Sequence, residues 1–252
     1  MKTDWNYTEL AQAYLKRSDY ADAAVDRLVT LAGAVPGTRV CDVGAGVAHL
    51  TLKLAARGLA IDAVEPNDAM RALGIERTAP FSSVRWSEGT GEDTGRVAGA
   101  YGLVTFGSSF NVTDRPRALV ETARILAPGG WFACLWNHRD VEDPLQKEIE
   151  TAIRSIVRDY AYGTRREDQV PVIAASGLFG EVTRIEEPVA HEQSAEDCLE
   201  AWRSHATLER QAGARFGEVL SAIEKILLKR GGRVRVPYVT RAWMAPVKKG
   251  AR

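Results

Sequence analysis

The segment from about residue 38 to 136 repeats one pattern, and this repeat limits the possible folds more than any other feature of the chain. A short apolar run is followed by a turn and then by residues with a helical period. Strands that alternate with helices in this way form parallel sheets. The predicted strands are Arg39–Val43, Ala60–Glu65, Ser83–Trp86, Leu103–Gly107 and Trp131–Trp136.

Helical signals separate these strands. Asn67 is placed to cap a helix that carries Met70, because an Asn side chain can accept a hydrogen bond from a first-turn amide. Leu119 and Leu126 belong to an apolar stripe at helical spacing. Pro128 and the two glycines after it end that helix.

Further elements are predicted on both sides of this repeat. Ala21–Leu31 is a predicted helix that packs over an edge or mouth of the sheet. The two late strands are expected to pair as a hairpin at a sheet edge, with the helices between them forming a lid. The late elements are helices Pro144–Tyr160, Ser194–Arg210 and Phe216–Arg230 and strands Glu181–Glu186 and Val234–Ala245.

Composition narrows the class of protein. The 252 residues suit one compact domain, and 45% hydrophobic with 26% charged residues is typical of soluble globular proteins. Lys plus Arg equal Asp plus Glu at 33 each, so no overall positive field favours nucleic acid or an acidic membrane. The start lacks an apolar signal run and no later stretch is long enough to cross a bilayer, so we expect a cytoplasmic protein.

The cysteines point to neither disulfides nor a metal site. Cys41, Cys134 and Cys198 are odd in number and far apart, and two of them lie in apolar runs. This spacing favours buried, reduced thiols, and no metal ligand set is predicted.

The strand at Val40 runs into a glycine-containing turn and then a helix. Gly44 and Gly46 let the backbone approach a ligand, and the helix N-terminus offers free amides to a carboxylate or phosphate. A dinucleotide fingerprint would need a third glycine where His49 stands. Asp42 would repel a pyrophosphate but suits an ammonium group.

Glu65 ends the second predicted strand, where an acidic side chain can accept hydrogen bonds from both hydroxyls of a ribose. The alternative is a solvated carboxylate at a strand end, which the glycine turn upstream makes the weaker interpretation. Together, the missing third glycine and Asp42 favour S-adenosylmethionine (SAM) over a dinucleotide.

Three correctly spaced motifs resemble those of the class I SAM-dependent methyltransferases. They are Asp42-Val-Gly-Ala-Gly46, Val64-Glu65-Pro66-Asn67 and Leu126-Ala-Pro-Gly-Gly-Trp-Phe132. The resemblance implies a Rossmann-like, mostly parallel seven-stranded sheet with an antiparallel last strand, helices on both faces and a helical lid over the carboxyl ends. It further implies one domain over residues 1–252, with lid elements at about 1–30 and 190–231.

The resemblance also implies SAM as cofactor, S-adenosylhomocysteine as its product, and a set of contacts. Met70 would lie against the adenine, Gly89-Thr90-Gly91-Glu92 beside its edge, and Phe106-Gly-Ser-Ser-Phe-Asn111 beside the methionine part. The implied cofactor-binding residues are Tyr14, Asp42, Gly44, Ala45, Gly46, Glu65, Pro66, Asn67, Met70, Thr90, Gly91, Glu92, Gly107 and Ser108.

A finer resemblance is to small-molecule methyltransferases of the trans-aconitate and related type. It is carried by Tyr14-x-x-Arg17-x-x-Tyr20, Trp136-Asn137-x-Arg139-Asp140 and Val236-Pro-Tyr-Val-Thr240. Asn111 stands where many such enzymes have His, so the resemblance carries no catalytic base to that position.

The predicted function is transfer of a methyl group to an oxygen, nitrogen or sulfur nucleophile of a small molecule. The methyl group of SAM is already activated, so positioning is the main requirement, and a base is needed only for a protonated nucleophile. The candidate catalytic residues are His138, Asn111 and Tyr14, and Trp202 and His205 would come from the lid. Aromatic and amide side chains suit a partly apolar acceptor.

Three rival functions stay open. A methyltransferase that acts on tRNA or a protein would share the cofactor motifs, although no basic, aromatic-interleaved surface is visible. A non-catalytic SAM-binding protein is the second, and a nicotinamide dehydrogenase, disfavoured by the missing glycine, is the third. We expect a monomer or homodimer without a nucleic-acid or membrane partner.

Overall fold

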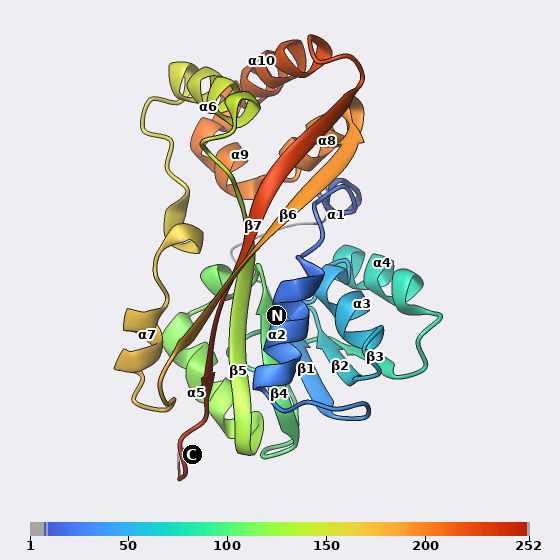
Figure 1. Ribbon diagram of the computed structural model, residues 1–252, viewed down its shortest axis with the longest axis vertical. Coiled ribbons are helices and arrows are strands. Elements are labelled where there is room, and N and C mark those ends of the chain that lie inside the picture. The colour runs from blue at the N-terminus through green and yellow to red at the C-terminus, as the bar shows by residue number, and fades with distance from the viewer. Residues whose placement is uncertain (1–7, 9, 251–252) are drawn as a thin grey trace.

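A computed structural model describes residue 8 and residues 10–250, and its centre is a seven-stranded sheet (Figure 1). The strand order is β3-β2-β1-β4-β5-β7-β6. The first five strands pair in parallel, and β7 runs antiparallel to both of its neighbours. The predicted sheet with an antiparallel last strand is therefore confirmed. The strands are β1 (Arg39–Val43), β2 (Ala60–Val64), β3 (Val84–Ser87), β4 (Tyr101–Gly107), β5 (Leu126–Arg139), β6 (Thr183–Ser194) and β7 (Arg233–Pro246).

Helices cover both faces of the sheet. On one face, Leu28 of α2 (Asp22–Leu31) and Leu54 of α3 (His49–Ala55) share an apolar cluster with buried residues of β1, β4 and β5. On the other face, α5 (Arg115–Ile125) and α7 (Val170–Ala175) pack on a second cluster. The sequence placed Ala21–Leu31 over an edge or mouth of the sheet, and the structure places α2 against β6 and β7, the two strands at one edge.

The lid is a group of four helices above the carboxyl ends of the parallel strands (Figure 1). It has its own apolar cluster, which includes Val234 and Tyr238 of the extended β7 strand. The remaining short elements are α1 (Ala11–Tyr14), α4 (Asp68–Thr78) and the 3-10 helices η1 (Phe110–Val112), η2 (Gly163–Arg166) and η3 (Gly213–Arg215). The lid helices are α6 (Pro144–Ile156), α8 (Ala195–Arg203), α9 (Ala206–Ala212) and α10 (Phe216–Leu228). The start of the predicted N-terminal lid element, residues 1–7 and 9, lies outside the described residues.

The late hairpin is confirmed, but β6 is longer than predicted. Glu181–Glu186 was expected, and the strand runs on to Ser194, paired with β7 from Thr183 opposite Met244 to Ser194 opposite Arg233. The ladder satisfies the backbone of this segment, so its polar side chains stay at the surface while it continues to the lid.

The predicted helix Ser194–Arg210 is broken into α8 and α9. Ser194 caps α8 by accepting a hydrogen bond from the Asp197 amide at 2.9 Å. His205 caps α9 in the same way, accepting from the Leu208 amide at 3.2 Å. Because a cap residue leaves the helical conformation, the chain turns at Ser204 and His205.

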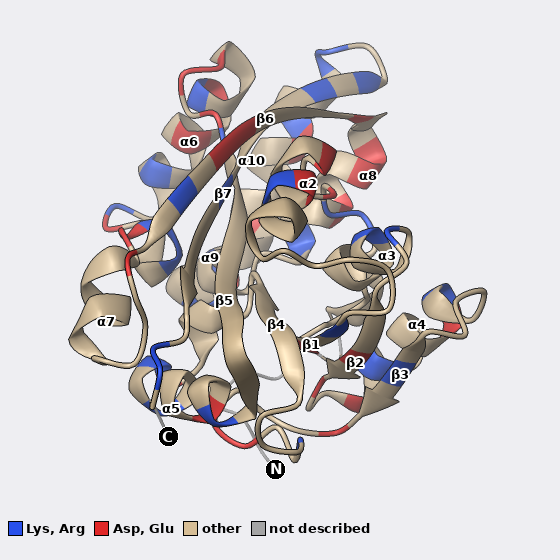
Figure 2. Ribbon diagram, turned by 60° about the horizontal axis from the view of Figure 1, so that its bottom comes forward, with Lys and Arg blue, Asp and Glu red and all other residues tan. Residues whose placement is uncertain are grey.

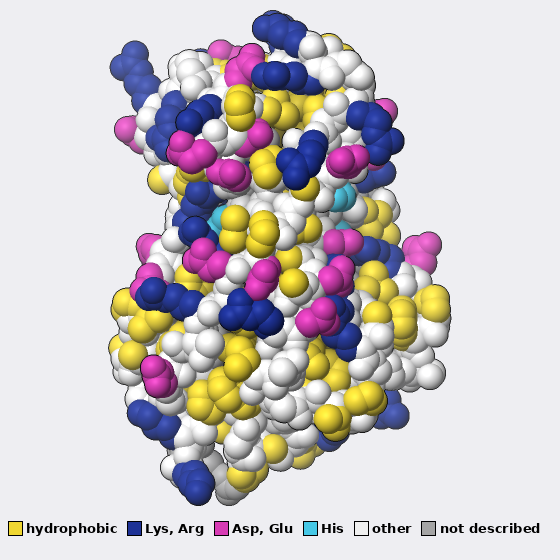
Figure 3. Space-filling model, viewed as in Figure 1, with side chains coloured by type: hydrophobic (Ala, Val, Ile, Leu, Met, Phe, Trp, Pro, Cys, Tyr) yellow, Lys and Arg dark blue, Asp and Glu magenta, His cyan; other side chains and the backbone are white. Residues whose placement is uncertain are grey.

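Charged side chains of both signs are interleaved over the outer helices and β6 (Figure 2), and the face drawn in Figure 3 likewise carries both. Within the described part of the chain, no helix combines the length and apolar character needed to cross a membrane. Cys41, Cys134 and Cys198 are buried free thiols, as predicted.

Candidate active site

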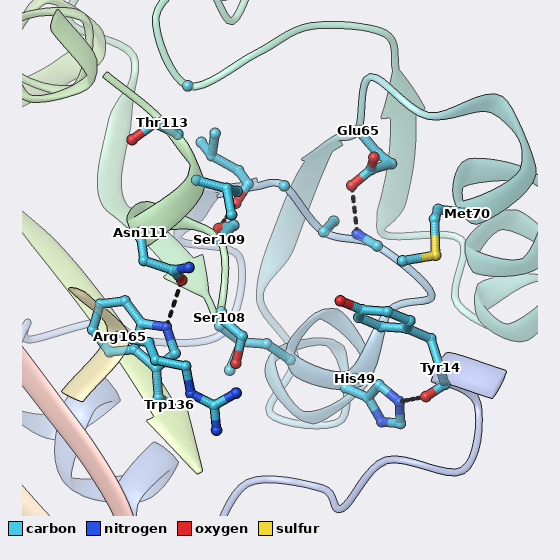
Figure 4. Close-up of a pocket in the computed structure, with 18 of the residues that line it drawn as sticks. Tyr14, His49, Glu65, Met70, Ser108, Ser109, Asn111, Thr113, Trp136 and Arg165 are labelled. Atoms are coloured by element: carbon cyan, nitrogen blue, oxygen red, sulfur yellow. Dashed lines mark hydrogen bonds between the residues drawn. The ribbon is translucent and has the colours of Figure 1, made fainter. Parts of the chain in front are cut away.

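A cavity of about 660 Å³ opens at the carboxyl ends of β1, β2, β4 and β5, beneath the lid. Every predicted cofactor-binding residue lines it, and so do the candidate catalytic residues Tyr14 and Asn111. Figure 4 shows Glu65, Met70 and Tyr14 on one side of this space and Asn111, Trp136 and Arg165 on the other.

The turn after β1 is held against the neighbouring strands. Both Gly44 and Ala45 donate their amides to the Val64 carbonyl, at 2.8 and 3.1 Å. Gly44 has a φ of +66°, and a Cβ built there would lie 2.4 Å from the Ser109 Cβ. Gly46 has a φ of +56° and its Cβ position is open apart from Met70 at 3.9 Å. The turn therefore needs glycine at position 44 for packing as well as for conformation.

Glu65 follows β2 and is fastened to the same turn. Its Oε2 accepts from the Gly46 amide and its Oε1 from the Asn67 amide, both at 2.9 Å. Burial raises the pKa of Glu65, and these two hydrogen bonds oppose the rise. A carboxylate has about four lone-pair sites, so two stay available to ligand hydroxyls.

Asp42 lies at the floor of the cavity, almost fully buried. Its two carboxylate oxygens accept from the hydroxyls of Thr51 at 2.6 Å and Thr105 at 2.8 Å. Burial raises the pKa of Asp42 to about 6, although the two hydrogen bonds lower it. A positively charged ligand in the cavity would therefore favour the ionised form of the Asp42 carboxylate.

The N-terminal segment closes the same side. The His49 ring meets the Tyr14 carbonyl at 2.9 Å through Nε2 and Asp19 Oδ1 at 2.7 Å through Nδ1. The side chain of Tyr14 points into the cavity beside Met70 (Figure 4). His49 therefore joins the helix after the glycine turn to the segment that covers it.

The loop after β4 forms the middle of the cavity. Ser108 has a φ of +60°, unusual for a residue with a side chain, and its hydroxyl lies 2.8 Å from that of Tyr20. Asn111 follows in η1, and its Oδ1 accepts from Trp136 Nε1 at 2.9 Å, which leaves the amide nitrogen of Asn111 and the second lone pair of its oxygen for other partners (Figure 4).

His138 does not reach the cavity, in contrast to the sequence prediction. Asn137 and Arg139 line the space, as does Trp136, whereas His138 points to η2. There its Nε2 donates to the Arg165 carbonyl at 2.9 Å. Burial lowers the pKa of His138 to about 3, so its ring is a neutral, structural group.

The lid residues divide in a similar way. Trp202 packs in the apolar cluster of the lid and does not line the main cavity. His205, at the break between α8 and α9, does line it, and burial lowers its pKa well below the usual value. Arg165 of η2 was not predicted, because residues 161–169 carry no periodic signal that would indicate their placement.

The lining residues divide by charge. The acidic ones that the structure describes are Asp42 and Glu65 beside the glycine turn, Glu92 and Asp93 after β3, and Asp114 before α5. Three of the four arginines, Arg17, Arg139 and Arg165, lie on the lid side, and Arg117 lies on α5 beside Asp114.

Known methyltransferases resemble part of this chain. Residues 41–134 match the family model described as a methyltransferase domain. An uncharacterized methyltransferase of Mycobacterium tuberculosis is 36% identical over 124 residues, which are 49% of this chain and 48% of that protein. A ubiquinone/menaquinone biosynthesis C-methyltransferase of Vibrio vulnificus is 28% identical over 154 residues, 56% of this chain and 59% of that protein.

The chain spans about half the length of the first of these relatives. Among solved structures, the YcgJ protein of Bacillus subtilis has a similar fold, with a TM-score of 0.56 at 15% identity. That likeness covers 90% of this chain and 99% of the other. Residues 41–134 are therefore similar to the methyltransferase domain family, a likeness that covers less than half of the chain.

Proposed function

We propose that this protein transfers a methyl group from SAM to an oxygen, nitrogen or sulfur atom of a small molecule. The observation that carries the proposal is one cavity with two unlike halves, the glycine turn with Asp42 and Glu65 on one side and the lid on the other. The trans-aconitate-type motif Tyr14-x-x-Arg17-x-x-Tyr20 supports a small acceptor, since all three of its side chains line this enclosed space.

The residues present fit SAM. Glu65 has lone pairs for the ribose hydroxyls, Met70 offers an apolar contact to adenine, and ionised Asp42 suits the positively charged methionine end. The open Cβ position of Gly46 leaves room for a ligand against the backbone. SAM supplies a methyl group activated by a sulfonium, so the protein must mainly bind and orient the acceptor.

The chain's own groups would work by positioning and by excluding water. Tyr14 and the lid residue His205 cover the cavity from two sides, and the amide of Asn111 faces the space between the halves. His205 is neutral and Asp42 is engaged by two hydroxyls, so this arrangement suits an acceptor that arrives with its nucleophile already deprotonated.

The direct test is production of S-adenosylhomocysteine with a panel of phenols, amines, thiols and carboxylic acids. The Vibrio vulnificus relative is by name a C-methyltransferase, so a quinol belongs in the panel as a carbon acceptor. Calorimetry with SAM and with NAD tests cofactor choice. Activity confined to tRNA or protein would support the macromolecular alternative, and SAM binding without any turnover would support a non-catalytic protein.

Asn111→Ala is expected to lower kcat by about tenfold to a hundredfold on the best acceptor of that panel, because a small misplacement of the reacting groups has effects of this order. The dissociation constant of SAM should stay within about twofold. Steady-state kinetics and calorimetry measure the two quantities. An unchanged kcat would remove Asn111 from the acceptor side of the site.

SAM affinity is expected to rise about tenfold between pH 5 and pH 7. Asp42 has a raised pKa of about 6 in the folded protein, so it is mostly protonated at pH 5 and ionised at pH 7. A cationic ligand binds the ionised form more tightly and releases the proton. Calorimetry across this range measures the effect, and Asp42→Asn should flatten it; an equal slope in that variant would assign the titration to another group.

The raised pKa of Asp42 also affects the stability of the protein without ligand, and here a rise in pH is unfavourable. The folded state binds the Asp42 proton more tightly than the unfolded chain, whose carboxyl titrates near 3.8. Between about pH 4 and pH 6 the contribution of Asp42 to the free energy of unfolding therefore falls as pH rises.

A further inference from the structure

Three guanidinium groups meet at the lid side of the cavity. Arg17 comes from the segment after α1, Arg139 from the end of β5 and Arg165 from η2, and all three line the same space. We call them the arginine cluster. In Figure 4 the guanidinium of Arg165 projects beside Trp136, on the side of the cavity opposite Glu65.

No carboxylate neutralises the arginine cluster within the described part of the chain. Arg17 donates to the Ser204 hydroxyl at 2.8 Å and the Ser204 carbonyl at 2.5 Å. Arg139 stacks on the Trp202 ring, 3.8 Å from its centroid. Arg165 Nε has no acceptor among these residues. Burial and the charges of the neighbouring arginines lower the pKa of Arg165 to about 10.

His205 adds a further hydrogen-bond donor to the unpaired donors of the arginine cluster. Its Nδ1 faces the Leu208 amide at 3.2 Å, which can only donate, and its Nε2 faces Arg165 NH1 at 3.2 Å, which also only donates. A neutral imidazole carries one proton, on either Nδ1 or Nε2. In either tautomer the protonated nitrogen therefore faces a group that also donates, and one of the two contacts is not a hydrogen bond. When Nδ1 accepts from Leu208, the Nε2 proton and the arginine both need an acceptor from the cavity.

We propose that the methyl acceptor carries an oxyanion, a carboxylate or a phosphate, which docks on the arginine cluster and His205 while SAM occupies the acidic half of the cavity. This inference rests on the proposed function and specifies its substrate class. Planar guanidinium groups bind such oxyanions with two parallel hydrogen bonds, and the anion would satisfy the donors that the protein leaves unpaired. It adds an anionic group to the partly apolar acceptor expected from the sequence, because the lid side is cationic.

Binding tests this without knowledge of the natural acceptor. The protein saturated with S-adenosylhomocysteine is titrated by calorimetry with succinate, benzoate and inorganic phosphate, and with succinamide and benzamide as neutral counterparts. We expect at least one anion to bind and the amides not to bind. A carboxylate that binds more tightly than phosphate identifies the acceptor as a carboxylic acid, and the reverse order identifies a phosphate ester.

Arg165→Gln should weaken binding of that anion about tenfold to a hundredfold, the range for hydrogen bonds to a charged group. Arg203→Gln is the matched control, since Arg203 is exposed on α8, paired with Glu200 and absent from the cavity wall. It removes the same charge from the lid and should change binding less than twofold. If Arg165→Gln no longer binds S-adenosylhomocysteine, the same titration is carried out with Arg139→Gln.

The outcomes separate this inference from the proposed function. Three results would overturn the oxyanion proposal. Either no anion binds, or the amides bind as well as the anions, or Arg165→Gln and the control Arg203→Gln weaken binding to the same extent. Methylation of neutral acceptors alone, at normal rates in Arg165→Gln, would overturn it while leaving methyl transfer intact. Failure to bind SAM at all would instead overturn the proposed function.

Discussion

Gly44→Ala is expected to lower the free energy of unfolding by about 2 to 5 kcal/mol and to abolish SAM binding. Two effects add. A left-handed backbone conformation is unfavourable by about 1 to 2 kcal/mol for a residue with a Cβ, and Gly44 has a φ of +66°. The new Cβ would also lie 2.4 Å from the Ser109 Cβ and 2.9 Å from its hydroxyl. Overpacking of this kind typically contributes about 1 to 3 kcal/mol.

The Ser109 hydroxyl is itself fixed, because it donates to the Val43 carbonyl at 2.5 Å, so the overlap cannot be relieved by rotating one side chain. Gly33→Ala is the matched control: Gly33 has a φ of +61°, and nothing lies within 4 Å of its Cβ position. Chemical denaturation of both variants measures the difference. Equal destabilisation would show that the turn after β1 is looser than the close approach of Ser109 implies.

The centre of the parallel sheet was predictable because β1, β4 and much of β5 are buried and therefore appear as apolar runs. β1 has the predicted bounds Arg39–Val43, and β2 ends one residue before the predicted Glu65. The outer strand β6 was harder to predict. Only its start has an apolar pattern, and its polar continuation to Ser194 is held in place by β7, a partner distant in the sequence.

The half of the cavity that contains the glycine turn was also predictable, since its residues lie at strand ends within short motifs. Asp42 and Glu65 end neighbouring strands, and the carboxyl ends of parallel strands meet at one edge. The acceptor half depends on finer detail. The sequence predicted that the strand ends at Trp136 and that His138 lies in the loop after it, at the cavity. Because β5 continues to Arg139, His138 is a strand residue, and its side chain points away from the cavity.

Arg165 shows what sequence reasoning lacked altogether. It lies in a 3-10 helix between α6 and α7, with no apolar period or motif around it. Its role appears only when the chain brings it beside Arg17 and Arg139, which the quoted motifs did contain. The charge of the acceptor half is thus a property of three distant segments, and no local pattern encodes it.

Glu65→Ala is expected to weaken binding of S-adenosylhomocysteine by about 1 to 3 kcal/mol, the range for hydrogen bonds to a charged group. The variant removes the acceptor proposed for the ribose hydroxyls. It also leaves the amides of Gly46 and Asn67 without the partners they have at 2.9 Å, which loosens the turn. A fall in affinity alone would therefore not distinguish direct contact from positioning of the backbone.

The distinction comes from a second ligand, the 2′-deoxy analogue of S-adenosylhomocysteine. If Glu65 accepts a hydrogen bond from the ribose, the unaltered protein should prefer the hydroxyl-bearing ligand, and Glu65→Ala should lose most of that preference. Glu65→Gln keeps one acceptor oxygen for the turn, so it should bind both ligands better than Glu65→Ala does. A preference that survives undiminished in Glu65→Ala would mean that Glu65 acts only through the turn, because removing a group cannot leave intact a discrimination that the group itself makes.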